Sequence, residues 1–280
     1  NSSLILMLRY YTRACNFYYG SKSKLLVKKK KSIPLSGNNQ ISFDHVELIS
    51  RKSKKKICIS ELSKVSKFKL RQIKEDLKKI SSKKKNFAKL KFSKLPNIMG
   101  ILNLTPDSFS DGGKFNKKNK GIKQAFKMYK SGASIIDVGG ESTRPGSKGV
   151  NAKVEWNRIN KILISICKKF PVSLDTRKSE IMEKGINYGV KIINDVSGLN
   201  YDLNTLNILK KNKTPFVIHH SQGTPDNMQK NPIYKNELLD IYDFFEKKIT
   251  FLRSIGIKHN NIIIDPGIGF GKNLKHNMSL

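Results

Sequence analysis

The stretch Met99–Gly113 reads MGILNLTPDSFSDGG, a short apolar run followed by a polar loop. The apolar part has the length and composition of a buried strand, because Ile and Leu follow one another without a charged residue. The loop carries Asn103, Asp107 and Asp111, with hydroxyl side chains between them. Loops rich in oxygen atoms can ligate a cation, but an Asx-rich turn has the same composition. Composition alone leaves these two interpretations equal.

The same order of apolar run, polar turn and amphipathic stretch repeats through the rest of the chain. This alternation predicts βα units and a parallel sheet, and nearly all-apolar strands are typical of a sheet covered on both faces. The predicted strands are Ile98–Leu102, Ser134–Ile136, Pro171–Leu174, Val190–Ile193, Pro215–Ile218 and Asn261–Ile264. The predicted helices are Lys120–Ser131, Ala152–Lys168, Lys178–Tyr188, Leu203–Asn212 and Lys235–Ile255.

Polar residues follow almost every predicted strand. An open doubly wound sheet concentrates its chemistry at one switch point, whereas a (β/α)8 TIM barrel presents groups from many strand ends at one rim. The pattern therefore favours an α/β fold of the TIM-barrel type. About six βα units precede Leu280, so we expect a barrel truncated before strands 7 and 8. The residues at the strand ends are Asn103, Asp137, Asp175, Asn194, Asp195, His219 and Asp265.

A change in composition near Leu95–Pro96 divides the chain into a basic N-terminal extension of unknown role, 1–95, and a barrel domain, 96–280. Residues 1–95 carry 26 basic and 5 acidic residues, against 29 and 16 in the remaining 185. A net charge of +34 is typical of proteins that bind nucleic acid. However, Lys is abundant together with Ile and Asn, as an A/T-biased genome would encode. We therefore keep nucleic-acid binding only as an alternative.

The three cysteines, Cys15, Cys58 and Cys167, have no metal-ligand or redox spacing. They are typical of reduced thiols in a cytoplasmic protein. No apolar run approaches the roughly 20 residues that span a bilayer, and no cleavage site follows Leu4–Leu8. We expect no membrane partner.

Two further segments carry candidate binding groups. In Gly139–Gly146, GGESTRPG, Arg144 can clamp an anion, or it can form a loop-stabilising pair with Glu141. The strand-end residues Asp175, Asn194 and Asp265 can bind a planar heterocycle with donors and acceptors on its edge. The alternative is a structural network at the rim.

The segment Asp265–Lys272, DPGIGFGK, is rich in glycine but lacks the Lys-Ser/Thr ending of a Walker A motif. Phe270 either walls a flat ligand or packs in the core. His219 and His220 are adjacent, and we reject a zinc site because no further ligands accompany them.

Six segments in order resemble the dihydropteroate synthases of the pterin-binding barrel family, from about Pro96 to Leu280. They are MGILNLTPDSFSDGG, IIDVGGESTRPGS, SLDT, IINDVSG, HSQGTPDNMQ and DPGIGFGKN. A weaker pattern, YY…PLSG…FDHVELISR, resembles an extension that precedes the barrel in some bacterial members.

The resemblance implies a transferase of folate biosynthesis. Such an enzyme joins 6-hydroxymethyl-7,8-dihydropterin diphosphate to 4-aminobenzoate, releasing pyrophosphate and forming 7,8-dihydropteroate. It implies small-molecule substrates, Mg²⁺ as cofactor and a homodimer.

The resemblance also implies roles for single residues. Asn103 would hold Mg²⁺ against the diphosphate. Asp175, Arg144 and Asp111 would be the catalytic residues. Asp137 is a weaker rim candidate. The substrate-binding set would be Thr143, Asp175, Asn194, Asp265, Phe109, Pro145, Phe270 and His219.

The sequence departs from the family at two places. His219 stands where a more hydrophobic residue is frequent, and the family's Ser-Arg-Lys motif of strand 7 and Arg and His of strand 8 are absent. The alternatives to an active synthase are therefore an inactive, truncated barrel remnant that binds pterin and, less favoured, a basic nucleic-acid-associated protein.

Overall fold

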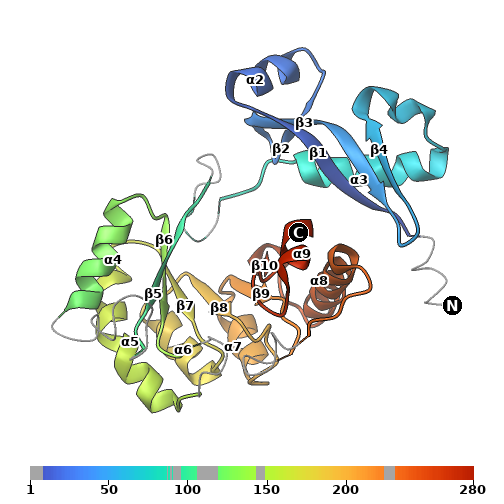
Figure 1. The fold of residues 1–280 in the computed structure, drawn as a ribbon. Coiled ribbons are helices and arrows are strands. Elements are labelled where there is room, and N and C mark those ends of the chain that lie inside the picture. Colours follow the sequence, from blue (N-terminus) through green and yellow to red (C-terminus); the bar gives the residue numbers. More distant parts are fainter. Residues whose placement is uncertain are drawn as a thin grey trace. The chain divides into compact units, whose positions relative to one another are not determined.

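A computed structural model describes residues 9–86, 88, 90, 96–105, 119–142, 149–223 and 231–280. The chain divides into two compact units, Asn1–Lys85 and Asn86–Leu280, which are labelled by element in Figure 1. Within the described ranges, no helix has both the length and the apolar character needed to cross a bilayer.

Over its described residues, 9–85, the N-terminal unit is an antiparallel sheet with two α-helices. Strand β3 pairs with β1, β2 and β4, so the longest strand organises the sheet. Its core includes Phe43, Val46 and Leu48 from β3, packed against Ile73 and Leu77 of α3. The elements are β1 Tyr11–Tyr19, α2 Gly20–Lys28, β2 Ile33–Leu35, β3 Asn38–Ile49, β4 Lys54–Cys58, the 3-10 helix η1 Ile59–Lys64 and α3 Lys67–Ser81.

The C-terminal unit is the predicted series of βα units. Six parallel strands form one sheet in the order β5-β6-β7-β8-β9-β10, the order in which they occur along the chain. The strands are β5 Met99–Asn103, β6 Ile135–Gly139, β7 Val172–Asp175, β8 Ile192–Asp195, β9 Phe216–His219 and β10 Ile262–Asp265. The helices are α4 Lys120–Lys130, α5 Ala152–Ile166, α6 Ser179–Asn187, α7 Thr205–Asn212, α8 Glu237–Ser254, the 3-10 helix η3 His259–Asn261 and α9 Leu274–Ser279.

This arrangement confirms the predicted α/β fold with alternating strands and helices. The helices cover one face of the sheet (Figure 1), and the side chains beneath them form the larger core, which includes Val138, Leu174, Ile193 and Ile218. In the described chain, β5 and β10 stand at the two ends of the sheet. Apolar residues are exposed on both strands, among them Ile101 on β5 and Ile264 on β10.

The strands begin one or two residues later, and end one to three residues later, than their apolar runs predict. Each ends on a polar residue or glycine that we placed after the strand, because the ladder of hydrogen bonds continues as long as the neighbouring strand supplies partners. For example, β7 ends at Asp175 and not at Leu174. These polar side chains therefore have the fixed direction of strand residues rather than the freedom of a loop.

A small apolar cluster lies on the sheet face opposite the helices, near the amino-terminal ends of the strands. Leu90 packs against Ile135, Ile192 and Val217, with Ala88 and Ile263 beside them. Leu90 precedes the composition change at Leu95–Pro96, yet it is buried in the C-terminal unit. Along the sequence, the boundary between the two compact units therefore falls about ten residues before the composition change that we used to divide the chain.

Candidate functional site at the strand ends

Four neighbouring strands place their last inward-facing residues in one row. Asn103 of β5 is in register with Gly139 of β6, Gly139 with Asp175 of β7, and Asp175 with Asn194 of β8. Residues in register on adjacent strands point to the same face. The side chains of Asn103, Asp175 and Asn194 are half-buried, so a ligand can still reach them.

On the next two strands the polar residues lie two positions beyond this row, because Asn194 is in register with Val217. His219 of β9 is in register with Asp265 of β10, and both residues lie on the face that carries the inner apolar layer lower down. Asp265 is half-buried, whereas His219 is buried. We use the name strand-end site for Asn103, Asp175, Asn194, His219 and Asp265.

Gly139 lets its two neighbours in this row approach closely, because it has no side chain. A Cβ atom at Gly139 would lie 3.3 Å from Oδ1 of Asn103 and 3.2 Å from Oδ2 of Asp175. An amide oxygen and a carboxylate oxygen therefore approach the same point. Within the described residues, no group of three or more His, Cys, Asp and Glu side chains is arranged to hold a metal ion.

Asp137 lies one layer below the rim, two residues before Gly139 on β6. Asn194 donates a hydrogen bond from Nδ2 to Oδ2 of Asp137 at 3.0 Å, whereas Oδ1 of Asp137 has no partner among the described residues. Burial raises the pKa of Asp137. The weaker rim candidate thus fixes the orientation of Asn194.

Asp175 is the most strongly perturbed acid of the strand-end site. Its pKa lies well above the ordinary value, chiefly because the protein removes water from the carboxyl and secondly because Asp137 and Asp195 place negative charge nearby. A carboxyl that is shielded from water and has no cationic partner is costly. A strongly perturbed acid at a strand-end rim is typical of a functional group.

The segment after Asp265 is a tightly bonded loop. Oδ1 of Asp265 accepts a hydrogen bond from the Gly267 amide at 2.8 Å. Gly267 has a φ of +68°, and a Cβ there would lie only 2.1 Å from the carbonyl oxygen of His220, so glycine is required. Lys272 is 3% exposed, and its Nζ donates hydrogen bonds to the carbonyl oxygens of Gly267 and Phe270 at 3.0 and 2.9 Å.

This loop carries Phe270 to the edge of the site. The Phe270 ring meets the His219 ring edge to face, with centroids 4.7 Å apart. Nδ1 of His219 lies 3.2 Å from the carbonyl oxygen of Val196, which assigns the proton to Nδ1. Burial lowers the pKa of His219, and it does so despite the nearby charge of Asp265. A neutral imidazole beside a half-buried phenyl ring forms one flat boundary of the site.

His220 points to a different environment from His219. Its ring lies edge to face with Phe244, at 4.9 Å between centroids, and its Nδ1 lies 3.1 Å from Nζ of Lys272. Burial, with the charge of Lys272 adding to it, lowers the pKa of His220 to about 4. His220 is therefore a buried neutral histidine that helps to hold Lys272.

The low pKa of His220 predicts a pH dependence of stability. The unfolded chain binds this proton with a pKa near 6.5, so the unfolded state holds more protons between about pH 6.5 and pH 4. Stability therefore falls as the pH decreases through this range. We expect His220→Gln, which keeps an acceptor for Lys272, to lose less stability over the range than the unchanged protein. Urea unfolding at several pH values measures the difference, and parallel losses in both proteins would contradict it.

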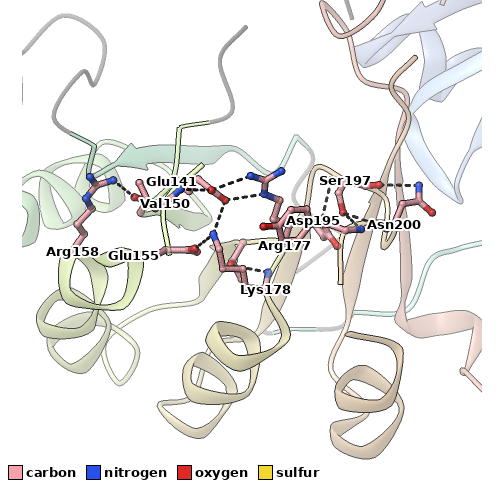
Figure 2. A network of polar contacts seen from close by, with 12 residues as sticks. Glu141, Val150, Glu155, Arg158, Arg177, Lys178, Asp195, Ser197 and Asn200 are labelled. Atoms are coloured by element: carbon pink, nitrogen blue, oxygen red, sulfur yellow. Dashed lines mark hydrogen bonds and ion pairs between the residues drawn. The ribbon is translucent and has the colours of Figure 1, made fainter. Parts of the chain in front are cut away.

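Five of the predicted site residues lie outside the described part of the chain. They are Phe109, Asp111, Thr143, Arg144 and Pro145. The described flanks of the second segment, Glu141 and Val150, contact each other through a hydrogen bond of 2.9 Å. The described charged partners of Glu141 are Arg177 and Lys178 (Figure 2), which sequence reasoning did not single out. The available signal was two basic residues directly after the SLDT strand.

Known proteins match about two thirds of this chain. The family model described as pterin binding enzyme matches residues 99–280. A dihydropteroate synthase from Haemophilus influenzae is 42% identical over 188 residues, which cover 66% of this chain and 68% of the relative. The chain belongs to the dihydropteroate synthases, within the pterin-binding enzyme family.

Solved dihydropteroate synthases share the fold as well as the sequence. The Clostridium difficile enzyme, solved in the presence of pteroic acid, has a TM-score of 0.60 and 38% identity, covering 70% of this chain and 71% of that one. The Xanthomonas albilineans enzyme with 4-aminobenzoic acid has a TM-score of 0.59 and 33% identity, covering 66% of each chain. The chain thus spans about two thirds of the length of these dihydropteroate synthases.

Proposed function

We propose that this chain contributes the pterin-binding part of the active site for the dihydropteroate synthase reaction. In that reaction 6-hydroxymethyl-7,8-dihydropterin diphosphate and 4-aminobenzoate give 7,8-dihydropteroate and pyrophosphate. The observation that carries the proposal is the row of Asn103, Asp175 and Asn194 at one rim, with Asp265 on the same face. Relatives solved with pteroic acid and with 4-aminobenzoic acid support the two substrates.

The strand-end site has the donors and acceptors that a pterin ring needs. Asp175 and Asp265 offer carboxyl oxygens to the ring's amino and N–H groups, and Asn194 offers both a donor and an acceptor. Because Asn194 is already oriented by Asp137, little ordering is needed when the ring binds. Phe270 and His219 then lie beside the ring as its flat neighbours.

The chemistry requires little beyond positioning and charge. The bond between the pterin methylene carbon and a diphosphate oxygen breaks, and the amine nitrogen of 4-aminobenzoate bonds to that carbon and loses a proton. Positive charge develops on the pterin, and a carboxyl of the strand-end site would stabilise it. We assign Asp111 and Arg144 to catalysis and Phe109, Thr143 and Pro145 to substrate binding on the resemblance.

Asn103 is the proposed ligand of Mg²⁺. The fit rests on the donor set, because the side-chain oxygens of Asn103 and Asp175 both lie close to Gly139 in the same row. Hard oxygen donors suit Mg²⁺, which usually takes one or two protein ligands and completes its shell with water and substrate phosphate. When bound, Mg²⁺ neutralises charge on the diphosphate.

Two further proposals rest on the resemblance. We place the protein in the cytoplasm, and we expect it to act as a homodimer.

Substitution of Asp265 tests the pterin assignment. Asp265→Asn keeps an oxygen for the Gly267 amide but removes the charge that the pterin N–H groups would meet. We expect affinity for the pterin diphosphate to fall about 10- to 100-fold, the equivalent of about 1.5–3 kcal/mol for a charged hydrogen bond. Isothermal titration calorimetry measures this, with the exposed Glu180→Gln as control.

An activity assay on the protein without substitutions tests whether the reaction takes place. The proposed function requires that the full-length gene product forms 7,8-dihydropteroate from both substrates with Mg²⁺. Tight pterin binding without turnover would instead favour the inactive barrel remnant. Unchanged pterin affinity in Asp265→Asn would remove Asp265 from the site.

A further inference from the structure

Lys272 is a buried cation at the end of the loop that follows β10. Its Nζ lies 2.9 Å from the carbonyl oxygen of Phe270, 3.0 Å from that of Gly267 and 3.2 Å from that of His220. Nδ1 of His220 lies 3.1 Å away, and it is the acceptor because an ammonium group only donates. Burial lowers the pKa of Lys272 to about 8, so the side chain is still charged at neutral pH. All four acceptors are uncharged, since His220 is neutral.

The four acceptors belong to two segments that follow neighbouring strands. His220 comes directly after β9, and its amide donates to the carbonyl oxygen of Asp265 at 3.0 Å. Gly267 and Phe270 lie in the loop after β10. Hydrogen bonds from an ionised donor are about twice as strong as those between neutral groups. The ammonium group therefore ties together the ends of the two strands that carry His219 and Asp265.

The loop has few side chains of its own to fix its shape. Gly269 and Gly271 have φ angles of +81° and +60°, which residues with a side chain rarely adopt. Ile268 is 55% exposed. Phe270 is therefore the side chain that the loop presents to the strand-end site, and its backbone carbonyl is bonded to Lys272.

Lys272 binds both ends of a short turn. The Phe270 amide donates to the Gly267 carbonyl oxygen at 3.0 Å, which closes the turn Gly267–Phe270. Nζ of Lys272 donates to the carbonyls of both residues. The Tyr234 hydroxyl donates to the Gly271 carbonyl at 2.8 Å and holds the loop one residue further on. The ammonium group is thus the contact that fixes the turn itself.

The turn decides where the Phe270 ring lies. Phe270 is half-buried and meets the His219 ring edge to face, with 4.7 Å between the centroids. A turn without its ammonium group would let this ring move away from His219. Asp265 keeps its place through the pairing of β10 with β9. The aromatic and the acidic parts of the site therefore depend on different contacts.

We propose that Lys272 is a positioning residue for pterin binding, which acts by holding Phe270 against His219. This inference rests on the proposed function, because the pterin is the flat ligand that Phe270 would meet. Lys272 itself is buried behind the turn and bonded to the backbone, so its effect on the ligand passes through Phe270 and not through Asp265.

A double-mutant cycle in the full chain tests this route. Lys272→Met keeps an unbranched side chain and removes the ammonium group. It is compared with Phe270→Ala and with the two changes combined. Lys275→Met is the matched control, since Lys275 is exposed and lies three residues further along the chain. Calorimetry with 6-hydroxymethyl-7,8-dihydropterin diphosphate measures the affinity of each protein.

We expect Lys272→Met and Phe270→Ala each to lower the pterin affinity about three- to tenfold, the scale on which a well-placed aromatic contact contributes. The combined variant should bind no more weakly than Phe270→Ala alone, because residues that act through one contact are not additive. Lys272→Met combined with Asp265→Asn should instead show the product of the two separate losses. Lys275→Met should match the unchanged protein.

A second variant and a measurement without ligand support the cycle. Lys272→Gln still carries two N–H donors, so it should recover part of the affinity, and the cycle is repeated with it if Lys272→Met does not fold. Amide exchange of residues 267–271, followed by mass spectrometry, should be faster in Lys272→Met than in the unchanged protein and in Lys275→Met.

Three results would overturn the proposal. They are an unchanged pterin affinity in Lys272→Met, unchanged amide exchange in residues 267–271, and losses in Lys272→Met and Phe270→Ala that multiply in the combined variant. The last result describes general damage to the unit rather than an effect through Phe270. If the unchanged protein does not bind the pterin diphosphate, the proposed function fails instead, and the exchange data still decide whether Lys272 holds the turn.

Discussion

Asp175→Asn is expected to abolish pterin binding and, at the same time, to make the protein more stable. The carboxyl has no cationic partner among the described residues, and burial together with Asp137 and Asp195 raises its pKa well above the ordinary value. An amide has nearly the same shape and carries no charge. The substitution therefore removes an unfavourable charge from the folded state and a required acceptor from the site.

The pH dependence of this gain has a definite sign. The unfolded chain releases the Asp175 proton near pH 4, whereas the folded chain keeps it to higher pH. Between these values the folded state binds more protons, so the stability of the unchanged protein falls as the pH rises. Asp175→Asn lacks this fall. Its advantage in melting temperature should be small near pH 4 and reach at least about 2 °C at neutral pH, the shift that about 1 kcal/mol produces in a domain of this size.

Asp195 supplies the matched control. It too is buried with a raised pKa, but its carboxylate accepts bonds from the amides of Ser197 and Leu199 at 2.8 and 3.2 Å. Asp195→Asn disturbs that turn and should gain no stability. Melting curves across pH, together with pterin titrations, separate the two variants. A destabilised Asp175→Asn that still binds pterin would contradict both halves of the prediction.

Lys178→Met is expected to be the most destabilising single change in the network around Glu141. Nζ of Lys178 bridges Glu141 and Glu155, and Oε1 of Glu155 already lacks a partner among the described residues. Removal of the ammonium leaves a fully buried carboxylate without a counter-charge. Breaking a buried pair in this way costs about 3–5 kcal/mol.

A second substitution distinguishes the charge from the packing. Lys178→Met combined with Glu155→Gln has no uncompensated charge at residue 155, so it should recover a large part of the lost stability. Lys184→Met removes an exposed partner of Glu180 and should cost less than about 1 kcal/mol. Urea unfolding of all four proteins gives the comparison. A loss below about 1 kcal/mol in Lys178→Met would show that the buried charge is compensated elsewhere.

The sequence predicted the barrel-type unit well because its information is local. Each βα unit contains its own apolar run and amphipathic helix, and the register of parallel neighbours follows from their order. The polar residues at the strand ends were also visible, and Asn103, Asp175, Asn194 and Asp265 do lie along one rim. What the pattern missed was that they close the strands rather than follow them.

The remaining features depend on contacts that are distant in sequence. In the N-terminal unit β3 pairs with β1, and α2 lies between them in the sequence. A short stretch of this lysine-rich sequence therefore does not predict the sheet. Glu141 is another example, since its described partners Arg177 and Lys178 are 36 and 37 residues away. A buried ion pair of this kind carries no periodic signal, only the coincidence of charges after two neighbouring strands.

The apolar contact of Leu90 also bears on how the chain can be divided in the laboratory. A barrel expressed from Pro96 would keep all six segments that resemble the family's barrel, yet it would lack Leu90, which packs at the amino-terminal side of the inner sheet face. Ile135, Ile192 and Val217 would then be exposed to water where Leu90 covers them in the intact unit. A fragment that begins at Asn86 retains Leu90, so it should be more stable than one that begins at the composition change.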